Sequence, residues 1–121
     1  MAAKDVATAF VQHYYTLFGS NRAELANLYQ ASSFLSWEGQ LSQGQGEIMQ
    51  KLQQLPQLRH QPSPDFDVQM STSNTAMIIF VQGKVQIDEN PQVQFTQVFQ
   101  LVAIASGQYY IHNDIFRLQY G

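Results

Sequence analysis

The chain has 121 residues, of which 45% are hydrophobic, and this is enough to bury the core of one compact domain. A net charge of −3 and no run of basic residues exclude nucleic acid as the main partner, and the absence of cysteine excludes disulfides, thiolate metal sites and cysteine nucleophiles. No apolar run approaches the ~18 residues of a membrane span, and no signal peptide opens the chain. We therefore expect residues 1–121 to form a single domain of a soluble intracellular protein that does not insert into membranes.

Helical periodicity dominates the first part of the chain. Apolar residues recur at steps of three and four over a helix that we place at about residues 3–18, with Gly19 as its C-cap. The members of this apolar stripe are Val6, Phe10, Tyr14, Leu17 and Phe18. Asn21 and Glu24 have the spacing of an N-cap and its capping-box partner, which predicts a short second helix to about residue 30.

The only tryptophan, Trp37, stands directly beside the carboxylate of Glu38 and just ahead of Gly39. Because neighbouring side chains of a strand point to opposite faces, a curve at the glycine lets Trp37 line the mouth of a hollow with Glu38 on its lip. An aromatic wall beside an acidic rim would bind an apolar side chain of a partner that is flanked by Lys or Arg. The alternative is a tryptophan in the core beside a solvated carboxylate. After Gly44 and Gly46 we expect a third helix that carries Ile48, Leu52 and Leu55 and ends before Pro56.

The rest of the chain has the period of two that is typical of strands. We expect strands at residues 66–70, 77–81, 93–102 and 109–118, with Gly83 as a candidate bulge. One side of the third of these strands carries Val93, Phe95, Gln97, Phe99 and Leu101. The last strand sets Tyr109, Ile111, Asn113 and Ile115 against Tyr110, His112, Asp114, Phe116 and Leu118. Helices followed by antiparallel strands predict an α+β fold, and apolar groups on both faces predict a partner or a second copy on the face that the helices leave open.

Few side chains have the spacing of a catalytic or metal site. The histidines show no ligand spacing and no phosphate-binding glycine loop is present, so we expect no metal or other cofactor. A pocket that holds a carboxylate base and a phenol donor, as in some dehydratases and isomerases, remains conceivable. Its candidate groups are Tyr14, Asp114, His112 and Glu38. Spacing selects none of these carboxylates as the base, and we favour a structural hydrogen bond or ion pair for Asp114.

Several segments taken together resemble the nuclear transport factor 2 family. They are residues 10–15, 17–18, 28–29, 37–40, 51–52, 55–56, 97–99 and 113–118, with Gly44. The resemblance implies a cone-like fold in which three N-terminal helices pack on a strongly curved antiparallel sheet around a hydrophobic cavity, and a homodimer formed by the other sheet face. It also implies a carrier without covalent chemistry, which binds the GDP-bound GTPase Ran and FG-repeat nucleoporins and takes Ran into the nucleus. Such a carrier is found in cytoplasm and nucleus, concentrated at nuclear pores.

The resemblance also assigns individual residues to this function. Trp37 is the cavity wall, Glu38 and Asp88 are acids on the rim, and Ile115 lies in the dimer interface. The remaining cavity positions are Leu55, Val85, Val93, Val98 and Phe116, although our strand register sets Val93 and Val98 on opposite faces.

Three positions depart from the family's pattern. A third rim acid aligns with Asn90, so that this charge is lost or moves to Glu89. The aromatic that grips FG repeats aligns near Ala3, which predicts weaker FG binding or a reliance on other apolar groups. His60 stands at an apolar cavity position, where a local shift would bring Leu58.

Two other functions fit the same fold. A small-molecule dehydratase or isomerase requires a closed pocket with an internal carboxylate whose pKa is shifted, whereas a carrier requires an open cavity with acids outside. The second is a module that forms a heterodimer with a related domain.

Overall fold

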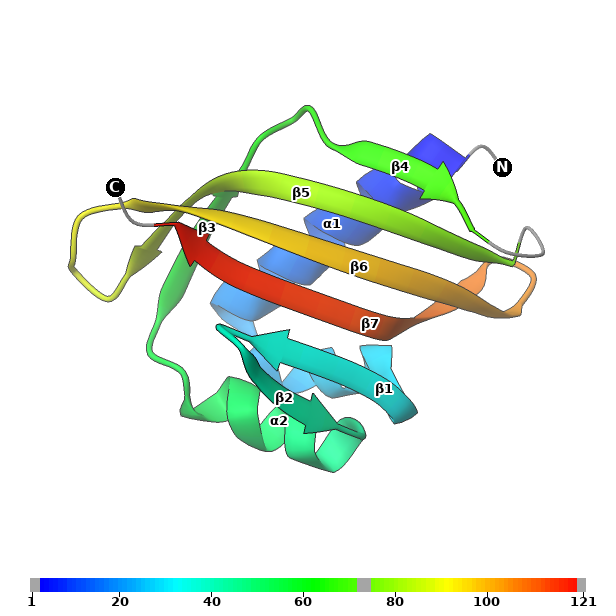
Figure 1. The fold of residues 1–121 in the computed structure, drawn as a ribbon, viewed down its shortest axis with the longest axis horizontal. Coiled ribbons are helices and arrows are strands. Elements are labelled where there is room, and N and C mark those ends of the chain that lie inside the picture. The colour runs from blue at the N-terminus through cyan, green and yellow to red at the C-terminus, as the bar shows by residue number, and fades with distance from the viewer. Residues whose placement is uncertain (1–2, 72–74, 120–121) are drawn as a thin grey trace.

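The structure is a computed structural model that describes residues 3–71 and 75–119. The helices in this part of the chain are α1 (Ala3–Ser20), the 3-10 helix η1 (Arg22–Leu28) and α2 (Gln45–Gln54). The strands are β1 (Tyr29–Trp37), β2 (Gln40–Gln43), β3 (Leu58–Pro62), β4 (Asp67–Met70), β5 (Ala76–Ile87), β6 (Val93–Ala105) and β7 (Gln108–Gln119). Helix α1 crosses one face of the sheet, and α2 lies beside β1 and β2 (Figure 1).

The strands form one mixed sheet in the order β2-β1-β7-β6-β5-β3, with β4 paired to the other half of the β5 edge. All of these pairs are antiparallel except β1 with β7, which run parallel. The α+β class is confirmed, but the expectation of a purely antiparallel sheet was wrong at this pair. Strand β2, helix α2 and strands β3 to β6 separate β1 from β7 in the chain, and such a long connection allows two strands to run in the same direction.

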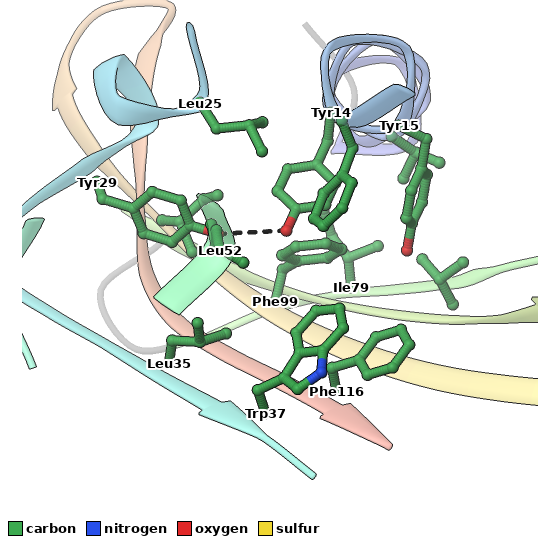
Figure 2. Close-up of a cluster of buried hydrophobic side chains, with 14 of the residues drawn as sticks. Tyr14, Tyr15, Leu25, Tyr29, Leu35, Trp37, Leu52, Ile79, Phe99 and Phe116 are labelled. Atoms are coloured by element: carbon green, nitrogen blue, oxygen red, sulfur yellow. Dashed lines mark hydrogen bonds between the residues drawn. The ribbon is translucent and has the colours of Figure 1, made fainter. Parts of the chain in front are cut away.

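The core fills the space between α1 and the inner face of the sheet. Tyr14 and Phe18 of the predicted apolar stripe are buried there, and the Tyr14 ring contacts both Phe18 and Phe99 of β6. Figure 2 shows Tyr14 and Phe99 with Tyr29, Trp37 and other buried side chains of this cluster. Full burial of each large apolar side chain contributes about 1.5–3 kcal/mol, so this face of α1 explains why the helix is stable.

The helix boundaries differ from the predicted ones. Helix α1 continues through Gly19 to Ser20, so this glycine is no C-cap. Asn21 makes no side-chain cap, and its carbonyl instead accepts the N–H of Glu24 at 3.0 Å. The segment that follows is a short 3-10 helix, and Tyr29 already belongs to β1. The predicted capping box was therefore wrong, because the chain tightens here into the i to i+3 pattern.

Strand β3 has no counterpart in the sequence prediction. It is polar, ends at Pro62 and pairs with the far half of β5 at the sheet edge, where a proline is tolerated. Gly83 of β5 is the register partner of Pro62, and the predicted bulge at Gly83 does not occur. A side chain at Gly83 would place its Cβ within 2.8 Å of the Pro62 Cα, so glycine is required for the close approach of the two strands.

A bulge in β7 changes which side chains face the core. The register against β6 shifts between Gln100 and Leu101, opposite His112. Tyr109 and Ile111 therefore share the inner face with Asp114, Phe116 and Leu118. The predicted grouping of the last strand was wrong for the residues before the bulge, because one inserted residue reverses the alternation.

Candidate binding site

An apolar cavity of about 190 Å³ opens where both ends of the sheet meet the α2–β3 connection. It is lined by Trp37, Leu55, Pro56, Leu58, Ile87, Phe116 and Leu118. Trp37 of β1 and Leu58 of β3 are separated by three strands, which would span roughly 19 Å in a flat sheet. Both residues contribute to one small cavity, so the sheet is strongly curved.

The size and lining of this cavity suit a single aromatic side chain. An apolar cavity of about 150 Å³ in another protein stays dry and admits a benzene ring, and this cavity is slightly larger. Carbon atoms of aliphatic and aromatic side chains supply its walls, so we expect it to select against charged groups.

Stacked rings form one wall of the cavity. The Trp37 and Phe116 rings lie 3.9 Å apart between centroids and are parallel within 4°. Phe95 stacks on Phe116 at 5.6 Å, and Phe18 stacks on Trp37 at 6.1 Å. Figure 2 shows Trp37 and Phe116 side by side below Phe99. Because each ring is held by another, the wall is formed before any ligand arrives.

Glu38 is tied to β7 at the edge of this wall. Its N–H donates to the Phe116 carbonyl at 3.0 Å, and its carboxylate accepts the N–H of Leu118 at 2.5 Å. The backbone at Glu38 has φ = 50°, in the left-handed region, which turns the chain directly after Trp37. These contacts fix a carboxylate beside two of the residues that line the cavity.

Asp88 stands on the opposite side of the cavity, at the end of β5. It also has a left-handed φ, 51°, and its N–H donates to the Gln57 carbonyl at 2.8 Å, while the Gln57 N–H donates to its carboxylate at 3.2 Å. This reciprocal pair joins the β5–β6 turn to the α2–β3 connection, next to Ile87 and Leu58 of the cavity wall. Asp88, Glu89 and Asn90 are exposed around an adjoining polar hollow of about 570 Å³.

The other predicted cavity residues lie elsewhere. Val85 and Val93 are paired with each other on the inner face of the sheet, outside the lining of this cavity. Val98 lies on the outer face, paired with Ile115, so its assignment to the cavity was wrong. The reason is the unbroken alternation of β6, which turns Gln97 and Phe99 inward and Val98 outward.

Several lining residues were absent from the predicted site. Leu118 is two positions beyond Phe116 on the same face of β7, and Ile87 directly precedes Asp88, so alternation and adjacency could have identified both. Pro56 adjoins the predicted Leu55 in the same way. Leu58 does line the cavity, whereas His60 lies deeper.

His60 is enclosed by aromatic rings. Its ring contacts those of Tyr15, Phe18, Phe95 and Phe116, with centroids 4.7–6.1 Å away. Both ring nitrogens are buried without a hydrogen-bond partner among the described residues. This burial, with a smaller effect of the Arg22 charge, lowers the pKa of His60 to about 3, so the imidazole is neutral.

The buried carboxylate of Asp114 lies inside the cone, which is the space between α1 and the inner face of the curved sheet. It accepts hydrogen bonds from the hydroxyls of Tyr29 at 2.7 Å and Tyr14 at 3.3 Å, and from the Gln97 side-chain amide at 2.8 Å. The Tyr15 hydroxyl donates to the same amide's oxygen at 2.7 Å, and Figure 2 marks the contact between the Tyr14 and Tyr29 hydroxyls. Burial raises the pKa of Asp114 to about 6, although these hydrogen bonds oppose the shift.

The four groups of the conceivable enzyme pocket are not brought together. Only Tyr14 and Asp114 meet, and the Asp114 side chain is 1% exposed. His112 contacts Tyr110 on the outer side, and Glu38 stands at the cavity edge. The geometry thus agrees with a structural hydrogen-bonding role for Asp114.

Within residues 3–71 and 75–119, no helix has the length and apolar character needed to cross a membrane. In the same ranges, no group of three or more His, Asp or Glu side chains is placed to hold a metal ion.

Comparisons with known proteins agree with this geometry. Residues 6–118 match the family model described as the nuclear transport factor 2 (NTF2) domain. The chain is 44% identical to nuclear transport factor 2B of Arabidopsis thaliana, over 95% of this chain and 93% of the relative, and 44% identical to nuclear transport factor 2 of Oryza sativa subsp. japonica over the whole of both. Its fold is similar to the structure of nuclear transport factor 2 from Cryptosporidium parvum, with a TM-score of 0.89, 38% identity and coverage of 97% and 94%. The chain belongs to the nuclear transport factor 2 domain family.

Proposed function

We propose that this protein is a nucleocytoplasmic transport carrier that binds the GDP-bound GTPase Ran through the cavity beside Trp37 and takes it into the nucleus. Membership of the family, with relatives named nuclear transport factor 2, supports the transport role. The observation that carries the Ran proposal is an apolar cavity of one-ring size with a carboxylate anchored on each side.

The energetics of such a site favour an aromatic side chain with basic neighbours. Burying a phenylalanine of the partner contributes about 1.5–3 kcal/mol, and the stacked wall needs little rearrangement. Glu38 and Asp88 then pair with Lys or Arg beside that phenylalanine. These pairs add modest affinity and have a larger effect on orientation and association rate, to which the net charge of −3 contributes. Glu89 is the neighbouring acid that substitutes for the charge missing at Asn90.

The outer face of the sheet supports a homodimer. Phe80, Val98 and Ile115 are paired in register across β5, β6 and β7, and the row continues through Ser36 to Leu41 of β2. Ile115 is 46% exposed and Leu41 66% exposed, which is unfavourable for an apolar row without a partner. We propose that a second copy covers this face.

FG-repeat nucleoporins are the second class of partner in this proposal. The chain has no aromatic near Ala3, so apolar groups at the groove between the two copies are the proposed contact. Binding there would concentrate the carrier at nuclear pores while it moves between cytoplasm and nucleus.

Isothermal titration with purified Ran tests the central proposal. Ran loaded with GDP is titrated into the protein, and Ran loaded with a GTP analogue is titrated in parallel. The expected result is saturable binding of the GDP form and much weaker binding of the other. No heat of binding with Ran-GDP at tens of micromolar protein would overturn the proposed function.

A further inference from the structure

The guanidinium of Arg22 binds backbone carbonyls at the C-terminal end of α2. Its Nη1 donates to the carbonyls of Leu52 at 3.0 Å and Leu55 at 2.8 Å, and its Nη2 donates to that of Pro56 at 2.9 Å. The Leu52 carbonyl, in the last turn of α2, also accepts the Leu55 N–H at 3.2 Å, whereas the carbonyls of Leu55 and Pro56 lie just beyond the helix, next to the negative end of its dipole. A forked cation satisfies several of them at once, which a lysine ammonium at a single point does not.

Two of these carbonyls belong to one wall of the cavity. Leu55 and Pro56 contribute side chains to its lining, and Arg22 holds the backbone of both. The Leu55 backbone is already extended, with ψ = 149°, so the chain leaves the helix at this point. The guanidinium therefore sets where the chain runs between α2 and β3.

The same guanidinium supports the opposite wall. Its central carbon lies 4.6 Å from the centre of the Phe18 ring, and Phe18 in turn stacks on Trp37 at 6.1 Å. A cation over an aromatic face is favourable and fixes the ring that it covers. Arg22 thus touches the backbone of one wall directly and reaches the Trp37 wall through a single ring.

We infer that Arg22 is a positioning residue that keeps the two walls of the cavity at the separation that an incoming aromatic side chain requires. It does not line the cavity, so its effect on binding is indirect and comes from preorganisation. For its Ran readout the inference rests on the proposed function, whereas its effect on the environment of Trp37 does not.

Two substitutions test this role. Arg22→Met keeps the apolar stem and removes the fork, and Arg22→Lys keeps the charge but not three simultaneous bonds. We expect Arg22→Met to weaken Ran-GDP binding about tenfold, equivalent to about 1.4 kcal/mol, and Arg22→Lys to lie between it and the unaltered protein. Because Trp37 is the only tryptophan, acrylamide quenching of the free protein reports on the cavity wall, and we expect quenching to rise in the same order.

Lys4→Met is the matched control. The Lys4 ammonium also donates to a carbonyl, that of Phe66 at 3.0 Å, and lies 3.8 Å from the centre of an aromatic ring, at the other end of α1. This variant loses the same kinds of contact without touching the cavity. We expect its Ran affinity and Trp37 quenching to equal those of the unaltered protein, at a temperature well below every melting midpoint.

The outcomes separate this inference from the proposed function. If Arg22→Met keeps Ran affinity within twofold and Trp37 quenching unchanged, the positioning role is refuted, even if its melting temperature falls. If the unaltered protein does not bind Ran-GDP, the proposed function fails, and the quenching of Arg22→Met against Lys4→Met still decides the role of Arg22. If Arg22→Met does not fold, Arg22→Lys carries both measurements.

Discussion

The cone holds its carboxylates in two different ways. At the cavity edge, Glu38 and Asp88 are anchored by backbone N–H groups, and their side chains stand beside an apolar hollow. Inside the cone, Asp114 is buried and each of its oxygens is bonded to a tyrosine or glutamine side chain. A pocket enzyme needs an acid that faces its substrate, whereas a carrier needs acids that face a partner's cations. Glu38 and Asp88 stand at the cavity edge, as the second arrangement requires, whereas the Asp114 side chain is 1% exposed.

Reversing the charge at the cavity edge should have the largest effect. Glu38→Lys places a cation where we propose that Ran presents its own cations, and such like-charge contacts cost several kcal/mol at an interface. We expect Ran-GDP affinity to fall more than a hundredfold in isothermal titration. Asp65→Lys, the same reversal at an exposed position in the β3–β4 connection, is the control and should bind normally. Equal affinity of the two variants would move the site away from Glu38.

The outer face of the sheet offers the next test, because Phe80, Val98 and Ile115 form an apolar row whose paired carboxylate, Asp67 of β4, stands only at its end. Ile115→Glu introduces one into the proposed dimer interface, where an unpaired charge costs several kcal/mol to bury. We expect sedimentation to show monomers. Gln12→Glu adds the same charge on the exposed side of α1 and should leave a dimer. A dimer in both variants would mean that copies meet elsewhere, and monomers of the unaltered chain would favour pairing with a different domain.

The internal carboxylate predicts a pH dependence of stability. Burial raises the pKa of Asp114 to about 6 in the fold, above its unfolded value of 3.8, so the folded state binds the proton more tightly. Proton binding by Asp114 therefore stabilises the folded state. This contribution to the free energy of unfolding is complete below about pH 4 and is lost as the pH rises through 6. Urea unfolding measures the free energy of unfolding of Asp114→Asn and of the unaltered protein at each pH. We expect the difference between them to shift in favour of the variant by on the order of 3 kcal/mol from pH 4 to pH 8. A difference that does not vary with pH would show that the Asp114 carboxyl keeps its ordinary pKa in the folded protein.

The smallest expected effect concerns a polar ring in the apolar region. Both nitrogens of His60 are buried among four aromatic rings without a partner in the described part of the chain, in contrast to Asp114, whose oxygens are all bonded. His60→Leu removes these groups at similar volume, and we expect the free energy of unfolding to rise by about 1 kcal/mol. Urea unfolding at pH 7 measures this change. A decrease would show that the ring contacts outweigh the unpaired nitrogens.

Some parts of this protein could be predicted from short-range patterns. The steps of three and four in α1 identify Tyr14 and Phe18 as buried, and the alternation of β6 turns Phe95 and Phe99 inward. The order Trp37, Glu38, Gly39 predicts a turn that sets a ring and an acid side by side. In each case the information lies within a few residues, because a helix or strand repeats its geometry every two to four positions.

Other parts depended on the tertiary structure. The bulge at His112 reverses the faces of β7, and alternation alone could not reveal it. Arg22 meets Leu55 across 33 positions and Tyr14 meets Asp114 across 100, so neither contact leaves a local signal. The family resemblance named Trp37, which lines the cavity, but also Val98, which lies on the outer face of the sheet.

What the sequence by itself determined is therefore the identity of the buried faces and the chemistry at the Trp37 turn. The cavity was decided only by folding, because its walls come from β1, β3, β5, β7 and the α2–β3 connection. These segments meet because the sheet curves and the guanidinium of Arg22 holds the end of α2. Local periodicity records how neighbours are spaced along one element, and it contains no information on which distant surfaces curvature will bring together.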